Sequence, residues 1–207
     1  MTRVILVDDY KHTRLWCDRI LKESGRYEVI ASFSNASNAE LACMRNNVDL
    51  VVMDVCTEDG DSGLVSAARI KQYHPDIKIV IMTSMPEYSF LSRAKEAGCE
   101  SFWYKDMGEI EFLDILDRTV KGESVYPERT PSVQIGAASS EEFTRRELEV
   151  IRELVLGKSY QEIARDMDVS VNTVKDHLKR IYAKTGYKKS LQVVVDAVGH
   201  KLVLPDF

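Results

Sequence analysis

The stretch Leu50-Val51-Val52-Met53-Asp54 carries four apolar residues directly into a carboxylate. An unbroken apolar run bounded by polar residues is typical of a strand that is buried on both faces of a parallel sheet. In such sheets, ligands and chemistry lie at the carboxyl ends of the strands. The sequence therefore places Asp54 where a reactive group would have to be.

Similar apolar runs lie on both sides of this stretch, and segments with helical periodicity alternate with them. The expected strands are residues 4–7, 27–33, 50–54, 78–82 and 101–104. The expected helices are about residues 13–23, 36–46 and 63–73, a segment that ends at Ala97-Gly98, and residues 110–120. Five strands that alternate with five helices indicate a five-stranded, doubly wound parallel α/β sheet of the flavodoxin-like type. We assign this domain to residues 1–121.

The character of the sequence changes after this domain. Residues 122–141 are rich in Gly, Pro, Ser and Ala and have no apolar period, so we expect a linker. In residues 142–207 every apolar pattern has the helical period. Thr144 and Glu147 form a capping box at the start of one helix, and Ser170 can cap another. Two short helices joined by a tight turn indicate a helix-turn-helix, so the second domain is expected to be small and all-α.

The formal net charge of −5 hides a difference between the two parts. Residues 1–140 contain 16 basic and 22 acidic residues, whereas residues 141–207 contain 12 basic and 11 acidic ones. Between residues 175 and 189 the only acid is Asp176. The basic residues there are Lys175, Lys179, Arg180, Lys184, Lys188 and Lys189. Such a local basic stripe attracts polyanions.

The composition argues against several other classes of protein. No apolar stretch approaches the roughly 18 residues of a membrane span, so we expect no membrane association. Met1-Thr2-Arg3 leads directly into a strand-like run, which argues against a signal peptide. The four cysteines are widely separated and have no metal-binding spacing, so we expect reduced thiols in a cytoplasmic protein. The side chain of Cys56 is expected to fill space rather than to react.

Four of the expected strands end in polar groups, which are Asp8-Asp9, Asp54, Thr83 and Lys105. Three carboxylates at one sheet edge would repel one another without a cation, and such oxygen ligands suit Mg²⁺. A lysine and a hydroxyl nearby provide a charge and a donor for the oxygens of a phosphoryl group in transfer. Singly, Asp8-Asp9 could cap a helix, Thr83 could be a turn hydroxyl and Lys105 a solvated charge. Together they favour transfer of a phosphoryl group onto Asp54.

With these residues in this order and spacing, about residues 3–121 resemble the receiver domain of two-component response regulators. The resemblance implies that Asp54 attacks the phosphorus of a phosphohistidine on a sensor histidine kinase. It also implies that Asp8, Asp9, Asp54 and the backbone carbonyl of Cys56 hold Mg²⁺.

The same resemblance assigns roles to three residues on neighbouring strands. Lys105 matches the lysine of the family, and Thr83 matches its switch hydroxyl. Phe102, three residues before the lysine, matches the aromatic side chain that rotates when the receiver switches.

The loop after the acceptor departs from the pattern of the family. Receivers usually have a Met-Pro turn and a shorter path to the next Gly-Leu, whereas residues 55–64 appear to be one residue longer. The loop from Thr57 to Ser62 also adds Glu58, Asp59 and Asp61. It could slow phosphorylation, alter the affinity for Mg²⁺ or shape the choice of kinase.

About residues 142–203 resemble the LuxR-type DNA-binding domain. The resemblance rests on residues 144–147 with Val150, on residues 162–164, and on residues 173–175 followed by His177 and Lys184. It implies contacts with base edges in the major groove from Lys175, Asp176 and Lys179. It implies contacts near the phosphates from Thr173, His177 and Lys184.

Two features of this domain allow more than one interpretation. Asp176 could accept a hydrogen bond from cytosine N4, or it could be a surface acid paired with Lys179 or Arg180. The apolar residues of the last helix could be core or the dimer contact that the family makes there. These residues are Leu191, Val194, Val195 and Val198.

The two resemblances together imply a DNA-binding response regulator of the NarL/FixJ type rather than an enzyme. Phosphorylation of Asp54 would shift the receiver equilibrium, and a homodimer on two-fold double-stranded DNA would regulate transcription. One alternative is a receiver-containing transcription factor that works without phosphorylation. Another is an Mg²⁺-dependent aspartyl phosphatase, but such enzymes usually need a second Asp two residues after the nucleophile, where this chain has Cys56.

Overall fold

The computed structural model describes residues 1–60, 62–105 and 108–204. The chain divides into two compact units, each of which is described by itself. The first unit comprises Met1–Ser84 and Ser89–Glu128, and the second comprises Met85–Tyr88 and Arg129–Phe207.

The first unit is built on a five-stranded parallel sheet with the strand order β2-β1-β3-β4-β5. Its strands are β1 (Thr2–Val7), β2 (Tyr27–Phe33), β3 (Leu50–Asp54), β4 (Lys78–Thr83) and β5 (Ser101–Tyr104). The connecting helices are α1 (Lys11–Glu23), α2 (Ala36–Arg45), α3 (Gly63–Tyr73), α4 (Phe90–Glu96) and α5 (Glu109–Val120). This confirms the predicted doubly wound parallel sheet. The stretch Leu50–Asp54 is its central strand, and all five of its residues are buried.

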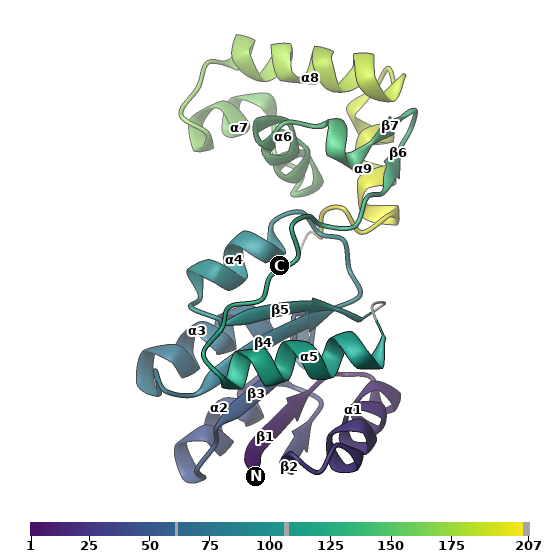
Figure 1. Cartoon of the computed structure of the whole chain (residues 1–207). Coiled ribbons are helices and arrows are strands. Elements are labelled where there is room, and N and C mark those ends of the chain that lie inside the picture. The colour runs from purple at the N-terminus through teal and green to yellow at the C-terminus, as the bar shows by residue number, and fades with distance from the viewer. Residues whose placement is uncertain (61, 106–107, 205–207) are drawn as a thin grey trace. The chain divides into compact units, whose positions relative to one another are not determined.

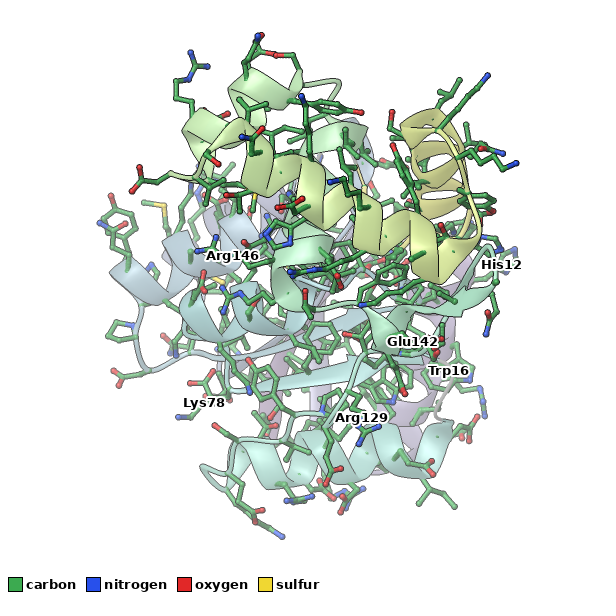
Figure 2. All side chains as sticks on the ribbon, turned by 90° about the horizontal axis from the view of Figure 1, so that it is seen from above. His12, Trp16, Lys78, Arg129, Glu142 and Arg146 are labelled. Carbon is green, nitrogen blue, oxygen red and sulfur yellow. The ribbon has the colours of Figure 1, made fainter. Side chains whose placement is uncertain are left out.

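Helices cover both faces of this sheet, which explains why its strands are apolar throughout. Figure 1 shows α1 and α5 over one face and α2, α3 and α4 over the other. Beneath α1 and α5 lies an aromatic cluster in which Trp16 (labelled in Figure 2) stacks on Trp103 with ring centroids 5.9 Å apart. Phe112 of α5 packs against Trp103 at 4.9 Å. These contacts fix α1 and α5 against the last strand.

The second unit is mainly helical, as predicted. Its helices are α6 (Arg145–Val155), α7 (Tyr160–Asp166), α8 (Val171–Thr185) and α9 (Ser190–Gly199). Thr144 and Glu147 form the expected capping box, Ser159 and Glu162 form a second one, and Ser170 caps α8. Helices α7 and α8 therefore form a helix-turn-helix whose boundaries are fixed by local sequence. No helix in the described ranges is long and apolar enough to cross a membrane.

The region expected to be a linker contains structure of its own. Strands β6 (Gln134–Ile135) and β7 (Ala138–Ser139) form an antiparallel hairpin, and a 3₁₀ turn, η3 (Ser140–Glu142), leads to α6. Ile135 and Ala138 are buried in the core of the second unit. Residues 123–128 belong instead to the first unit. The expected linker at 122–141 is thus divided between the two units.

Candidate functional site

The acidic residues predicted from the strand ends lie together at the carboxyl edge of the sheet. Asp8 follows β1, and one of its carboxylate oxygens accepts a 2.8 Å hydrogen bond from the backbone N–H of Tyr10. Asp54 is the last residue of β3. One oxygen each of Asp8, Asp9 and Asp54 lies within 4.8 Å of the others. Asp8 and Asp54 are buried and Asp9 is half-buried.

Lys105 joins two of these carboxylates. Its Nζ lies 2.6 Å from Oδ2 of Asp54 and 2.7 Å from Oδ2 of Asp8. The lysine follows β5, two strands away from β3, so only the parallel topology brings it to the site. The structure therefore brings together four of the residues that were predicted for the phosphoryl site.

The electrostatic balance of this cluster favours binding of a further cation. Burial raises the pKa of Asp54 to about 7, although Lys105 opposes this shift. Burial also raises the pKa of Asp8. The pKa of Lys105 is raised by its two ion pairs, which outweigh the opposing effect of burial. The single ammonium group of Lys105 does not neutralise the three carboxylates. Their hard oxygen atoms are ligands that suit Mg²⁺.

Thr83 and Phe102 lie on the two strands beside the acidic cluster. Thr83 is the last residue of β4, and it is buried. Phe102 lies in the middle of β5, where its side chain is 1% exposed. Its ring packs against Tyr104 at 5.1 Å and against Tyr126 at 6.2 Å. The contact with Tyr126, outside the sheet, was not expected from the sequence.

The loop after Asp54 folds back onto the strand that precedes it. Cys56 and Ser62 form an isolated antiparallel bridge, and the N–H of Gly63 donates to the carbonyl of Val55 at 2.8 Å. A Cβ atom on Gly63 would lie 1.9 Å from the carbonyl oxygen of Asp54, so only glycine fits this close approach.

The described part of the loop Thr57 to Ser62 includes a 3₁₀ turn at Glu58–Gly60. The N–H of Glu58 donates to the carbonyl of Ser34 at 3.1 Å, which ties the turn to the chain after β2. Asp61 and the side chain of Asp59 lie outside the described residues. The Cys56 side chain is half-buried, and its sulfur is in no disulfide among the described residues.

Helix α8 of the helix-turn-helix presents one exposed face. Its exposed residues recur at intervals of three and four: Asn172, Lys175, Asp176, Lys179, Arg180 and Ala183. Three of them are the predicted base-contacting residues. Thr173 and His177 are half-buried at the edge of this face. Asn172 lies on the same exposed face, because the spacing of Lys175, Asp176 and Lys179 extends to it.

Asp176 and Lys179 form an ion pair on this face, with Nζ 3.3 Å from Oδ1. Their side chains are 61% and 78% exposed, respectively. Exposed pairs of this kind contribute little to stability, so both side chains remain available to a partner.

Lys184, which was predicted to lie near DNA phosphates, is held inside its own domain. Its Nζ donates to Oε2 of Glu147 at 2.6 Å and to the backbone carbonyl of Glu142 at 2.7 Å. It also lies 5.7 Å from the ring centroid of Phe143. Glu147 is only 1% exposed. The pair therefore ties the end of α8 to the start of α6.

Comparison with known proteins supports this division of the chain. Residues 4–117 match the family described as "Response regulator receiver domain", and residues 141–197 match "Bacterial regulatory proteins, luxR family". The response regulator protein VraR of Staphylococcus aureus is 30% identical over 97% of this chain and 98% of its own length.

Two solved structures share the fold. The chain is similar to RcsB from Salmonella enterica serovar Typhimurium, bound to promoter rprA in the presence of phosphomimetic BeF3−, with 18% identity and a TM-score of 0.63. This match covers 94% of this chain and 96% of that one. The response regulator ChrA of a heme-sensing two-component system is 24% identical, with a TM-score of 0.51 over 97% of this chain and 98% of that one.

The acidic strand-end cluster and the helix-turn-helix define a class of protein in which a receiver controls a DNA-binding domain. The chain belongs to the family of two-component response regulators that combine a receiver with a LuxR-type domain. It is a DNA-binding response regulator of the NarL/FixJ type.

Proposed function

We propose that Asp54 is the phosphoacceptor of this response regulator and that a sensor histidine kinase is the donor. The single observation that carries the proposal is the contact of Lys105 with both Asp54 and Asp8, at 2.6 and 2.7 Å. In the proposed reaction a carboxylate oxygen of Asp54 forms a bond to phosphorus. The bond between phosphorus and the histidine nitrogen breaks, and its electron pair leaves with the imidazole.

The acidic side chains supply the remaining parts of the proposed site. Asp8, Asp9 and Asp54, with the backbone carbonyl of Cys56, would hold Mg²⁺. When bound, this ion would neutralise charge on the carboxylates and on the phosphoryl oxygens. Lys105 would transfer its hydrogen bond from the carboxylate of Asp54 to a phosphoryl oxygen, and Thr83 would donate to another.

The output of the proposed switch is binding of a homodimer to double-stranded DNA. Helix α8 would enter the major groove with the face that includes Lys175, Asp176 and Lys179. Leu191 and Val195 of α9 are 67% and 65% exposed, and they would form the contact between two copies. A protein with this function would work in the cytoplasm.

The acceptor assignment is tested with acetyl phosphate and Mg²⁺. The unaltered protein should gain an acyl phosphate, which is labile in strong acid and in base, and Asp54→Asn should gain none. Asp114→Asn is the matched control, because Asp114 is an exposed carboxylate on α5. Label on Asp54→Asn would show that another residue is the acceptor. A wild-type protein that gains no label would favour a regulator that works without phosphorylation.

A further inference from the structure

The chain that leaves α5 does not go directly to the DNA-binding domain but returns along the last strand of the sheet. The N–H of Phe102 donates to the carbonyl of Val125 at 2.9 Å. The N–H of Val125 donates to the hydroxyl of Ser101 at 3.0 Å. That hydroxyl is also 2.6 Å from the hydroxyl of Thr119 on α5. We call residues 123–128 the strap.

Tyr126 fastens the strap at three points. Its hydroxyl donates to the carbonyl of Cys99 at 2.9 Å, just before β5 begins. Its ring centroid lies 6.2 Å from that of Phe102. The Nζ of Lys95 on α4 lies 4.8 Å from the ring centroid of Tyr126, within the range of a cation–π contact. The Tyr126 side chain therefore contacts Cys99 before β5, Phe102 of β5 and Lys95 of α4.

The strap covers an otherwise open edge of the sheet. Strand β5 is the last in the order β2-β1-β3-β4-β5, so one side of its backbone has no neighbouring strand. An unpaired N–H group on such an edge has to find another acceptor. The carbonyl of Val125 supplies that acceptor to Phe102, the residue that matches the rotating aromatic of receivers. The backbone and the ring of Phe102 are thus both held by the strap.

The same strand carries the lysine of the acidic site. Lys105 follows β5 and donates directly to Asp54 at 2.6 Å, which leaves no room for a group between the two atoms. A phosphoryl group on this oxygen of Asp54 therefore has to displace the Lys105 ammonium from it. Lys105 directly follows β5, three residues from Phe102, so a shift of the strand end that accompanies this displacement would act on the strand that the strap holds. The strap holds the strand in the arrangement that has the direct ion pair.

We propose that the strap is a clasp that opposes phosphorylation of the receiver and that opens when Asp54 is modified. This inference rests on the proposed function, because it concerns the regulation of the same site. Opening would break the bond from Phe102 to Val125 and the ring contact with Tyr126. Residue 129, where the second unit begins, is three residues beyond Tyr126, so an open clasp would lengthen the tether to the DNA-binding domain.

Thermodynamic linkage predicts the direction in which loss of the clasp changes the affinity of Asp54 for a phosphoryl mimic. If modification of Asp54 opens the clasp, loss of the clasp must favour modification by the same free energy. Tyr126→Phe removes the hydrogen bond to Cys99 and keeps the ring. Tyr126→Ala removes both. The affinity for beryllofluoride in the presence of Mg²⁺ should rise about two- to tenfold in Tyr126→Phe, the range expected for one hydrogen bond, and further in Tyr126→Ala.

The test uses the full chain and two measurements. Beryllofluoride binding is followed by titration for the wild type, both Tyr126 variants and Tyr73→Ala. Tyr73 is a matched control because it is a tyrosine of α3 with 72% exposure. Hydrogen exchange of the Phe102 amide is measured with and without beryllofluoride, and it should become faster when the mimic binds to the wild type.

The outcomes separate this inference from the proposed function. If beryllofluoride binds but the Phe102 amide exchanges at an unchanged rate, the proposal that the clasp opens is wrong. The assignment of Asp54 as the acceptor is then unaffected. An affinity in the two Tyr126 variants that equals that of Tyr73→Ala would also overturn the clasp. If beryllofluoride does not bind to the wild type at all, the proposed function fails, and the clasp fails with it.

Discussion

Replacement of Lys184 by methionine separates a structural role of this lysine from a role in DNA binding. The substitution keeps an apolar stem of similar length and removes the ammonium group. Oε2 of Glu147 then loses a 2.6 Å partner, and the carbonyl of Glu142 loses a 2.7 Å one. Glu147 keeps its bond from the N–H of Thr144, at 2.8 Å.

The expected cost follows from the burial of the pair. Removal of one partner from a fully buried ion pair costs about 3–5 kcal/mol, whereas an exposed pair contributes about 0–1 kcal/mol. Glu147 is 1% exposed and Lys184 is 28% exposed, so this pair lies between the two cases. We expect Lys184→Met to lower the free energy of unfolding of the second unit by about 2 kcal/mol.

The sequence offers a convenient assay for this loss. Both tryptophans, Trp16 and Trp103, lie in the first unit, so their fluorescence reports on the unfolding of that unit. Far-ultraviolet circular dichroism also detects the helices of the second unit. In Lys184→Met, the dichroism transition of the second unit should shift down while the fluorescence transition stays in place. Lys179→Met is the control, because Lys179 is 78% exposed and its loss should cost less than about 0.5 kcal/mol.

The pH dependence gives a second check of the same pair. Burial alone would raise the pKa of Glu147, but hydrogen bonds from Lys184 and Thr144 outweigh it and lower this pKa. The stabilisation is therefore present above the pKa of an unfolded glutamate and is lost as the pH falls through the lowered value. Lys184→Met should reduce this acid dependence. An unshifted dichroism transition in Lys184→Met, together with weaker DNA binding, would refute the structural role.

Three further predictions concern the rest of the molecule. Lys179→Ala should weaken DNA binding by about 1–3 kcal/mol if the residue reads a base, and an unchanged affinity in a gel shift would remove it from the interface. Gly136→Ala should destabilise the second unit by about 1–3 kcal/mol. The reason is that φ at this position is +61° and the new Cβ would lie 2.4 Å from the carbonyl oxygen of Thr185. An unchanged dichroism transition would contradict this expectation. Mg²⁺ at about 100 times its Kd should stabilise the first unit by about 2.7 kcal/mol, and Asp9→Asn should reduce this gain in the fluorescence transition; equal gains would exclude Asp9 as a ligand.

The sequence predicted the sheet and the acidic cluster because both depend on local patterns. An apolar run such as Leu50–Met53 identifies a buried strand, and the polar residue after each strand lies at one edge by topology alone. Capping boxes fixed the starts of helices in the same way, as at Thr144. These features need no knowledge of which distant residues meet.

The features that the sequence did not predict depend on contacts between distant residues. Lys184 has the charge of a phosphate contact, but its partner Glu147 lies 37 residues earlier. The hairpin at 134–139 is too short to show a period, and it is stabilised by contacts such as the 2.7 Å bond from the N–H of Gly136 to Asp196. The strap likewise has the composition of a linker, and only the position of β5 at the sheet edge gives Val125 a partner.

Modification of Asp54 is expected to control DNA binding. The most direct measurement is the DNA affinity and oligomeric state of the full chain, with Mg²⁺, in the presence and absence of beryllofluoride. The mimic should promote dimer formation and tighten DNA binding in the wild type, and it should do neither in Asp54→Asn. A wild-type protein whose oligomeric state and DNA affinity are the same with and without bound beryllofluoride would show that modification of Asp54 does not control DNA binding.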